Sequence, residues 1–484
     1  MRVLWAAIVG MSAIIAGCSP QEPTGIAAAA DAMGATNLNT IEYSGSGSLF
    51  GFGQAYLPGE AWPRFVQRSY RVSVNYQTPA MQLDTTRSQA LFPPHGGAAQ
   101  PVAGDQRTVV AVSDKFAWTE GGAQVVPNPA AVGDRSRVMW ATPHGAIKAA
   151  IANGGTLDGK TIAFKLDKRD FKVTLNDQNL VEKVNYLNTN EVIGDYPVEI
   201  TYSDYTDYGG VKFPKHIVQT DDGFPTLDIQ IDEVRPNAAV TIDVPANVPT
   251  APPPPAAPMV TMDKLADGVW YVNADGARSW AVEFKDYIVA VEGIGREARS
   301  VAVNEAIVKA IPNKPIKYVV NTHAHYDHAG GLRTYVAQGV TVVTQETNKP
   351  FFEQVWARPR TIAPDLLAKA PRPPMFETVA DKKVITDGAQ TLEIYRMENS
   401  GHNGANLIVY HPKAGLVFWG DGYNPPEGND PRDFARTPEY GLDLYRNITE
   451  LNLNVKTIAP AHGAGARPFD NLKKAIGMMS VAAE

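Results

Sequence analysis

The residues best suited to chemistry lie in one short stretch of the chain, residues 321–331 (NTHAHYDHAGG). Three histidines and one aspartate fall within six positions of this stretch: His323, His325, Asp327 and His328. Imidazole nitrogens together with a carboxylate suit Zn²⁺, whereas Ca²⁺ and Mg²⁺ prefer shells made of oxygen. An isolated histidine is usually a solvated turn residue, but four metal-capable side chains this close together predict a zinc site.

The flanking sequence indicates how these side chains are positioned. The apolar run 316–320 predicts a buried strand, and residues 329–338 predict a helix. The ligand stretch therefore lies where a strand ends and a helix begins, a frequent place for active sites in α/β folds. His323 and His325 are two positions apart, so an extended backbone directs both side chains to the same side. Asp327 and His328 follow where the chain turns, and they can face the first two across a gap.

Further candidate ligands lie downstream in glycine-flanked turns next to strand-like runs: His402, Asp421 and His462. Glycine in such turns lets the backbone come close to a metal ion. Each of these residues alone is as readily a loop residue as a ligand. Together with the first stretch they form a set large enough for two ions. The remaining histidines are expected in loops or at the surface: His95, His144, His216 and His411.

The order of these motifs resembles the metallo-β-lactamase superfamily of hydrolases, over about residues 260–484. The motifs are His-x-His-x-Asp-His, Gly-His, Gly-Asp and a late Ala-His-Gly. The resemblance implies a four-layer αβ/βα sandwich with two zinc ions at one edge, iron or manganese being alternatives. It implies one zinc site made of His323, His325 and His402. It implies a second site made of Asp327, His328 and His462, with Asp421 bridging the two ions.

Such a site suggests a hydrolytic mechanism. Zinc lowers the pKa of a bound water from about 15.7 to about 7, which supplies hydroxide at neutral pH without a protein base. We predict that this hydroxide attacks a substrate carbonyl lying against one zinc ion, while Asp327 steadies the hydroxide and the leaving group. Tyr423, two residues after Asp421, is a candidate hydrogen-bond donor to the developing oxyanion, and packing at the rim of the site is the alternative.

The residue at position 421 bears on the substrate. True β-lactamases of the superfamily generally carry Cys or Ser there, whereas thioesterases of the glyoxalase II kind, lactonases and phosphodiesterases carry Asp. The predicted function is therefore hydrolysis of an ester, lactone or thioester bond in a small molecule. Alternatives are a β-lactam hydrolase, or a binding or relay protein whose N-terminal domain captures an apolar ligand. Iron-based oxidoreduction ranks last, since no flavin-binding domain is evident. Substrate choice is expected in loops 359–374 and 423–436.

The rest of the chain suggests a second domain. A length of 484 residues predicts two or three domains. Residues 40–244 read mostly as alternating strands, which predicts an antiparallel sheet curved around one or two helices, with one helix at about 137–152. Residues 208–214 and their flanking strands weakly resemble lipoprotein-carrier half-barrels. The proline-rich stretch 245–259 predicts a semi-rigid linker before the hydrolase domain, 260–484.

The N-terminus and the charge suggest a location and argue against one class of partner. Residues 1–18 resemble a lipoprotein signal peptide that ends in the lipobox 15–18, where Cys18, the chain's one cysteine, would be lipidated. Residues 19–39 are expected to be a tether, and Ser19 implies an outer-membrane protein that faces the periplasm. The net charge of −7 comes without a basic stripe, which argues against a nucleic-acid partner.

Overall fold

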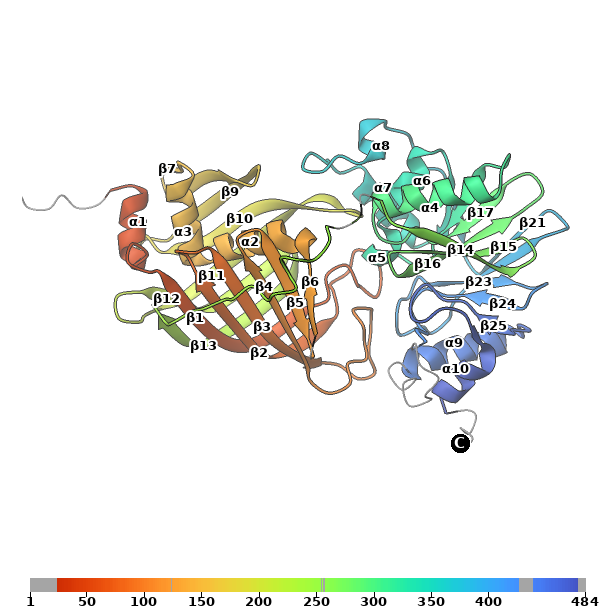
Figure 1. The fold of residues 1–484 in the computed structure, drawn as a ribbon, viewed down its shortest axis with the longest axis horizontal. Helices are drawn as coiled ribbons and strands as arrows, with labels where there is room; N and C mark the ends of the chain where they lie inside the picture. The colour runs from red at the N-terminus through yellow and green to blue at the C-terminus, as the bar shows by residue number, and fades with distance from the viewer. Residues whose placement is uncertain (1–23, 123, 254, 256, 426–437, 478–484) are drawn as a thin grey trace, which may run out of the picture.

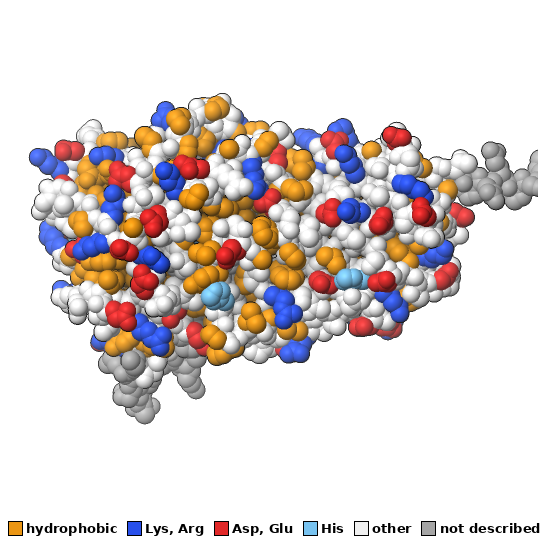
Figure 2. Space-filling model, turned by 180° about the vertical axis from the view of Figure 1, so that it is seen from behind, with side chains coloured by type: hydrophobic (Ala, Val, Ile, Leu, Met, Phe, Trp, Pro, Cys, Tyr) orange, Lys and Arg blue, Asp and Glu red, His pale blue; other side chains and the backbone are white. Residues whose placement is uncertain are grey.

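The structure is a computed structural model that describes residues 24–477, apart from 123, 254, 256 and 426–437 (Figure 1). The predicted signal peptide with Cys18 and the start of the predicted tether lie outside the described residues. Within the described part of the chain, no helix has the length and apolar character needed to cross a membrane. On the face seen in Figure 2, acidic and basic side chains are interspersed over both domains.

The N-terminal domain is built on a 13-stranded antiparallel sheet that curves around its helices, which confirms the predicted fold class (Figure 1). The strands lie in the order β6-β5-β4-β3-β2-β1-β13-β12-β11-β10-β9-β8-β7, so β1 pairs with the last strand of the domain. The strands are β1 (Thr40–Phe50), β2 (Arg64–Asn75), β3 (Ala80–Gln89), β4 (Gln106–Ser113), β5 (Phe116–Gly121), β6 (Gln124–Pro127), β7 (Thr156–Asp158), β8 (Thr161–Leu166), β9 (Arg169–Leu175), β10 (Val181–Asn190), β11 (Gly194–Asp207), β12 (Lys212–Asp221) and β13 (Phe224–Pro236).

Three α helices pack against this sheet: α1 (Ile26–Met33), α2 (Val132–Ala141) and α3 (Pro143–Ala152). The single helix predicted at about 137–152 is wrong, because the chain breaks at Thr142. The Thr142 side chain accepts a hydrogen bond from the Gly145 N–H and caps α3, whose first residue is Pro143. Helix α1 lies within the range predicted as a tether. Its residues Ala29, Ala30 and Met33 are buried in the domain core.

His144 contradicts the prediction that it lies in a loop or at the surface. It lies in α3 with no exposed surface, its Nε2 is 3.0 Å from the carbonyl oxygen of Met33, and its ring stacks on Phe213. Helix α3 has few polar residues and is buried almost throughout, so the imidazole is carried into the core with it. Burial lowers the pKa of His144 to about 4, although the hydrogen bond with Met33 acts in the opposite direction.

The buried imidazole makes stability depend on pH. Between pH values of about 6.5 and 4, the unfolded chain binds a proton at His144 that the folded chain does not. The contribution of His144 is therefore fully present above about pH 6.5 and is lost as the pH falls toward 4. Between pH 7 and pH 5, the free energy of unfolding should fall by about 2 kcal/mol more in the wild type than in His144→Gln.

Denaturant titrations at the two pH values measure this difference. His216→Gln serves as a control, since His216 lies on strand β12 and is partly exposed beside Asp228. An equal loss of stability in the wild type and in His144→Gln would contradict the prediction.

The C-terminal domain has the predicted four layers, a helix layer on each side of two face-to-face sheets (Figure 1). Helices α4, α6 and α7 cover the first sheet, and α9 and α10 cover the second. The 7-stranded sheet contains β14 (Val260–Ala266), β15 (Val269–Ala274), β16 (Ala277–Glu283), β17 (Ile288–Val291), β18 (Ile316–Val320), β19 (Thr341–Gln345) and β20 (Phe376–Val379). The 6-stranded sheet contains β21 (Lys382–Thr386), β22 (Thr391–Arg396), β23 (Leu407–His411), β24 (Leu416–Phe418), β25 (Thr457–Ile458) and β26 (Arg467–Pro468). The helices are α4 (Glu297–Ala310), α5 (Tyr326–Ala329), α6 (Leu332–Ala337), α7 (Asn348–Trp356), α8 (Leu366–Lys369), α9 (Pro438–Glu450) and α10 (Phe469–Ala475).

The position of His411 also contradicts the prediction. It was expected at the surface of a hairpin turn, but it ends strand β23 and is only 1% exposed. Its Nε2 lies 2.9 Å from the side-chain oxygen of Gln390, which satisfies the buried ring.

The two domains contact each other through the segment that follows α7. Arg358 forms an ion pair with Asp222 at 2.8 Å, and Arg360 donates to the backbone carbonyls of residues 190–192. The backbone N–H and hydroxyl of Thr361 both donate to the carboxylate of Asp195. The start of the 359–374 loop, where substrate choice was expected, therefore docks onto the N-terminal domain.

Candidate metal centre

The first ligand stretch lies where the sequence predicted, directly after β18. The side-chain amide of Asn321 donates to the carbonyl oxygen of His323, at 2.7 Å, and holds the turn. Helix α6 lies within the range predicted as a helix, 329–338, but a short helix, α5, precedes it and contains Asp327 and His328, which were predicted in a turn. The break between the two helices lies at Gly330, which packs directly against the carbonyl oxygen of Gly295, where a β-carbon would not fit.

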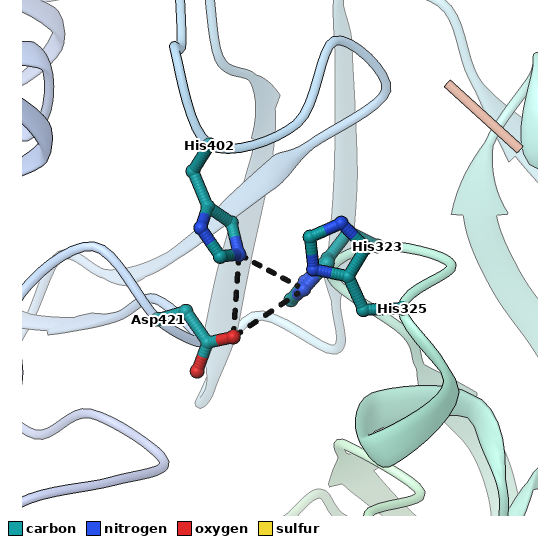
Figure 3. Close-up of side chains that lie close together, drawn as sticks. All are labelled: His323, His325, His402 and Asp421. Carbon is teal, nitrogen blue, oxygen red and sulfur yellow. Dashed lines mark hydrogen bonds and ion pairs between the residues drawn. The ribbon is translucent and has the colours of Figure 1, made fainter. Parts of the chain in front are cut away.

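The structure brings every predicted metal ligand into one of two clusters that share Asp421. Within each cluster the ligand atoms all lie within 4.8 Å of one another. The first cluster, drawn in Figure 3, contains His323, His325, His402 and Asp421. The second contains Asp327, His328, Asp421 and His462.

The carboxylate of Asp421 lies between the clusters and directs one oxygen to each. Its Oδ2 is 3.2 Å from the Nε2 of His402 and 3.7 Å from the Nε2 of His323 (Figure 3). Its Oδ1 is 3.0 Å from the Nε2 of His328 and 3.2 Å from the Nε2 of His462. This is the arrangement of a carboxylate that can bridge two cations.

A buried carboxylate that the sequence reasoning missed supports the second cluster. Glu292 has no exposed surface, and one of its oxygens accepts a hydrogen bond from the Nδ1 of His328. Its other oxygen accepts from the backbone N–H of Thr322 at 2.6 Å. A carboxylate on the far nitrogen of a ligand histidine fixes the tautomer that leaves Nε2 available to a metal ion. The available signal was a glutamate placed directly after the apolar strand β17 and before a glycine.

Two more contacts come from the N-terminal domain, where no catalytic residue was predicted. The Nε2 of His325 lies 2.8 Å from the carbonyl oxygen of Ala55. The side-chain amide of Gln54 donates to Oδ1 of Asp327 at 2.8 Å, although the two residues are 273 positions apart. Neither Gln54 nor Ala55 carries a sequence signal, because one is a common polar residue and the other acts through its backbone.

The electrostatics of the first cluster favour neutral imidazoles. Burial lowers the pKa of His323 well below its ordinary value, and His328 beside it acts in the same direction. Burial, together with His402, lowers the pKa of His325 to about 3. Both rings are therefore neutral at pH 7, which is the form that binds metal ions.

The second cluster favours a cation. Burial acts to lower the pKa of His328, but the carboxylates of Asp421, Asp327 and Glu292 outweigh it and raise that pKa well above its ordinary value. Burial acts to raise the pKa of Asp421, but His328 and His462 outweigh it and hold that pKa well below its ordinary value. The raised pKa of His328 and the lowered pKa of Asp421 both indicate a position that attracts positive charge.

The donor set fits zinc. Zinc in proteins is bound by histidine nitrogens and by aspartate or glutamate oxygens, which are the atoms present here. His325 gives a second indication, because its Nδ1 is buried and has no hydrogen-bond partner among the described residues, while its Nε2 faces Ala55. A buried polar atom of this kind needs a partner, and a metal ion would supply one.

A cavity of about 910 Å³ opens beside the clusters, and both domains line it. Its lining includes four of the predicted ligands, namely Asp327, His402, Asp421 and His462. The described residues that line it from the N-terminal domain are Gln54, Arg87, Ala98, Ala99, Gln100, Pro101, Ala103 and Gln106.

Tyr423 lies in a hydrophobic cluster under α9, and it is not among the residues that line this cavity. Its ring is buried, and burial raises the pKa of the phenol to about 12. The predicted hydrogen bond from Tyr423 to an oxyanion stays a prediction. Its position favours the alternative role, which is packing at the rim of the site.

Comparisons with known proteins show what this chain is similar to. The beta subunit of 2,4-dinitroanisole O-demethylase from Nocardioides sp. (strain JS1661) is 34% identical over 86 residues, which are 18% of this chain. The match spans only 27% of the length of that relative. The FIM-1 metallo-β-lactamase of Pseudomonas aeruginosa, in its mono-zinc form, is 19% identical with a TM-score of 0.35, over 46% of this chain and 96% of its own.

A metallo-β-lactamase from Pontibacter korlensis is 22% identical with a TM-score of 0.34, over 46% of this chain and 98% of its own. The rubredoxin oxygen:oxidoreductase of Desulfovibrio gigas is 14% identical with a TM-score of 0.37, over 45% of this chain and 61% of its own. Residues 293–462 match the family model described as the Metallo-beta-lactamase superfamily, a range that contains every predicted ligand. This part of the chain, residues 293–462, is therefore a metallo-β-lactamase-like domain.

Proposed function

We propose that this protein is a zinc-dependent hydrolase that cleaves an ester, lactone or thioester bond in a small molecule. The observation that carries the proposal is the position of Asp421, with one carboxylate oxygen directed to each ligand cluster. Two zinc ions bound there would bring the pKa of water to about 7 and polarise the carbonyl that is attacked.

The clustered residues would have distinct roles in this reaction. His323, His325 and His402 would hold one ion, and Asp327, His328 and His462 the other. Asp327 lines the cavity, and its side chain is 44% exposed. Its Oδ2 faces His328 and His462, so this carboxylate would hold the second ion and steady the hydroxide and the leaving group.

The residue type at position 421 and the cavity support a small ester or thioester. An aspartate at this position is typical of superfamily thioesterases and lactonases, whereas β-lactamases generally have Cys or Ser there. A volume of about 910 Å³ lies within the range of typical small-molecule sites. The cavity also contains Arg87 and several amide side chains, which can bind polar groups of a substrate.

Initial rates on a panel of substrates test the proposal. The panel contains an aryl ester, an acyl lactone, a thioester, nitrocefin and an aryl phosphodiester, each with and without a chelator. We add 2,4-dinitroanisole because the name of the 34% identical relative includes it. We expect turnover of the ester, lactone or thioester that the chelator abolishes and added zinc restores.

The other outcomes contradict the proposal in distinguishable ways. Turnover confined to nitrocefin would make the protein a β-lactam hydrolase. Turnover confined to the phosphodiester or to the aryl ether would move the reaction away from acyl transfer. No turnover on any compound would favour a metal-bearing binding protein.

A further inference from the structure

A loop of the N-terminal domain, residues 51–56 between β1 and β2, lies between the two ligand-bearing turns of the other domain. It reaches toward α5 in Figure 1. The backbone N–H of Tyr326 donates to the carbonyl oxygen of Gly53, at 3.1 Å. The backbone N–H of Gly404 donates to the carbonyl oxygen of Tyr56, at 2.9 Å. Backbone hydrogen bonds therefore attach this loop both to the His323–His328 turn and to the His402 turn.

From this position the loop contacts one ligand in each cluster. The carbonyl oxygen of Ala55 accepts a hydrogen bond from His325, which belongs to the first cluster. It also accepts one from the side-chain amide of Asn403, at 3.2 Å. Gln54 donates to Asp327, which belongs to the second cluster. Contacts of this kind fix the tautomer of a ligand histidine and the orientation of a ligand carboxylate.

A second loop of the N-terminal domain, residues 94–98, holds Gln54 in place. The side-chain oxygen of Gln54 accepts a hydrogen bond from the backbone N–H of Ala98, at 2.8 Å. The loop is attached to the other domain by the Gly96 N–H, which donates to the Gly401 carbonyl, and by the hydroxyl of Tyr440, which donates to the Gly96 carbonyl. Gly97 fits closely here, since a β-carbon would lie 2.7 Å from the Cε1 of His325.

We propose that the N-terminal domain is an integral part of the metal centre, with Gln54 and Ala55 as positioning residues for Asp327 and His325. The geometry of each cluster then depends on the docking of a domain whose described residues include none of the clustered ligands. This inference concerns metal binding and holds whichever bond the enzyme cleaves, so it goes beyond the proposed function.

Zinc affinity of the full-length chain, measured by competition with a chromophoric chelator, tests the proposal without a substrate. In Gln54→Ala we expect one of two bound zinc ions, the one at Asp327, to bind about 10- to 100-fold more weakly. The other ion should keep the wild-type affinity. Gln77→Ala is the matched control, because Gln77 is exposed on the same domain, and it should bind zinc as the wild type does.

Gln54→Glu separates the contact with Asp327 from the packing of the loop. The glutamate keeps an oxygen to accept from Ala98 but cannot donate to Asp327 when ionised. It should weaken zinc binding at the Asp327 site at least as much as Gln54→Ala does. If Gln54→Ala fails to fold, Gln54→Glu is the variant that tests the proposal. Wild-type affinity for both ions in Gln54→Glu would overturn the proposal. Equal weakening of zinc binding at both sites in a folded variant would overturn the role of Gln54 as the positioning residue for Asp327, since Gln54 contacts a ligand of only one cluster.

Discussion

Asp421→Ala is expected to remove one of the two zinc ions of the proposed centre and nearly all hydrolytic activity. Among the described residues, the carboxylate is the one group that belongs to both clusters, with Oδ2 3.2 Å from His402 and Oδ1 3.0 Å from His328. Its loss removes a ligand from each ion and leaves their mutual repulsion uncompensated. We expect turnover to fall by about 1,000-fold, which corresponds to about 4 kcal/mol of activation free energy. Elemental analysis and initial rates measure the two effects.

Two further variants make the Asp421 result specific. Asp381→Ala removes an exposed aspartate of the same domain and should retain full zinc and full activity. Asp421→Glu keeps a carboxylate on a longer side chain, so it should restore part of the second zinc. Full zinc occupancy in Asp421→Ala would refute the bridging role.

The second large effect is expected from Glu292→Gln. The glutamate is completely buried, and it bonds to the Nδ1 of His328 and to the N–H of Thr322. The Glu292 carboxylate stabilises the tautomer of His328 that has its proton on Nδ1, so that Nε2 is free to face Asp421. A neutral amide stabilises this tautomer less. We expect zinc to bind about 10- to 100-fold more weakly at the His328 cluster. Chelator competition measures the affinity, and activity should be recovered at saturating zinc.

Glu305→Gln is the control for Glu292, because Glu305 is exposed on helix α4. It should leave zinc affinity unchanged. If Glu292→Gln lost activity at saturating zinc while binding zinc normally, Glu292 would act on the reaction rather than on the metal ligand.

The sequence was most informative where chemistry and local structure coincide. Strand β18 spans residues 316–320 as predicted, because a run that is apolar except for Lys317 and ends in a polar turn leaves few alternatives. The ligands could be found because imidazoles and carboxylates at short spacing are rare outside metal sites. The break between α2 and α3 was missed, although the sequence contains its signal, since Pro143 begins a helix far more readily than it continues one.

The partners of the ligands were less accessible to sequence reasoning. Ala55 acts through its carbonyl oxygen, which every residue has, and Gln54 meets Asp327 only when the two domains dock. His144 and His411 are buried because Met33 and Gln390 supply their hydrogen bonds, and those pairings exist only in the folded chain. Lipidation of Cys18 and the outer-membrane location stay predictions, since residues 1–23 lie outside the described residues.

The pairing of β1 with β13 has a consequence for the order of folding. It joins Ile41 to Pro236, so the strand that leads into the 51–56 loop finds one of its two partners only after most of the N-terminal domain has been synthesised. A pairing between strands so far apart in the chain closes a long loop, and the entropy cost of that closure makes the contact slow to form. The metal ligands lie later still, between residues 323 and 462. The complete metal centre is therefore a late product of folding, formed after the distant strands of one domain and the two sheets of the other have assembled.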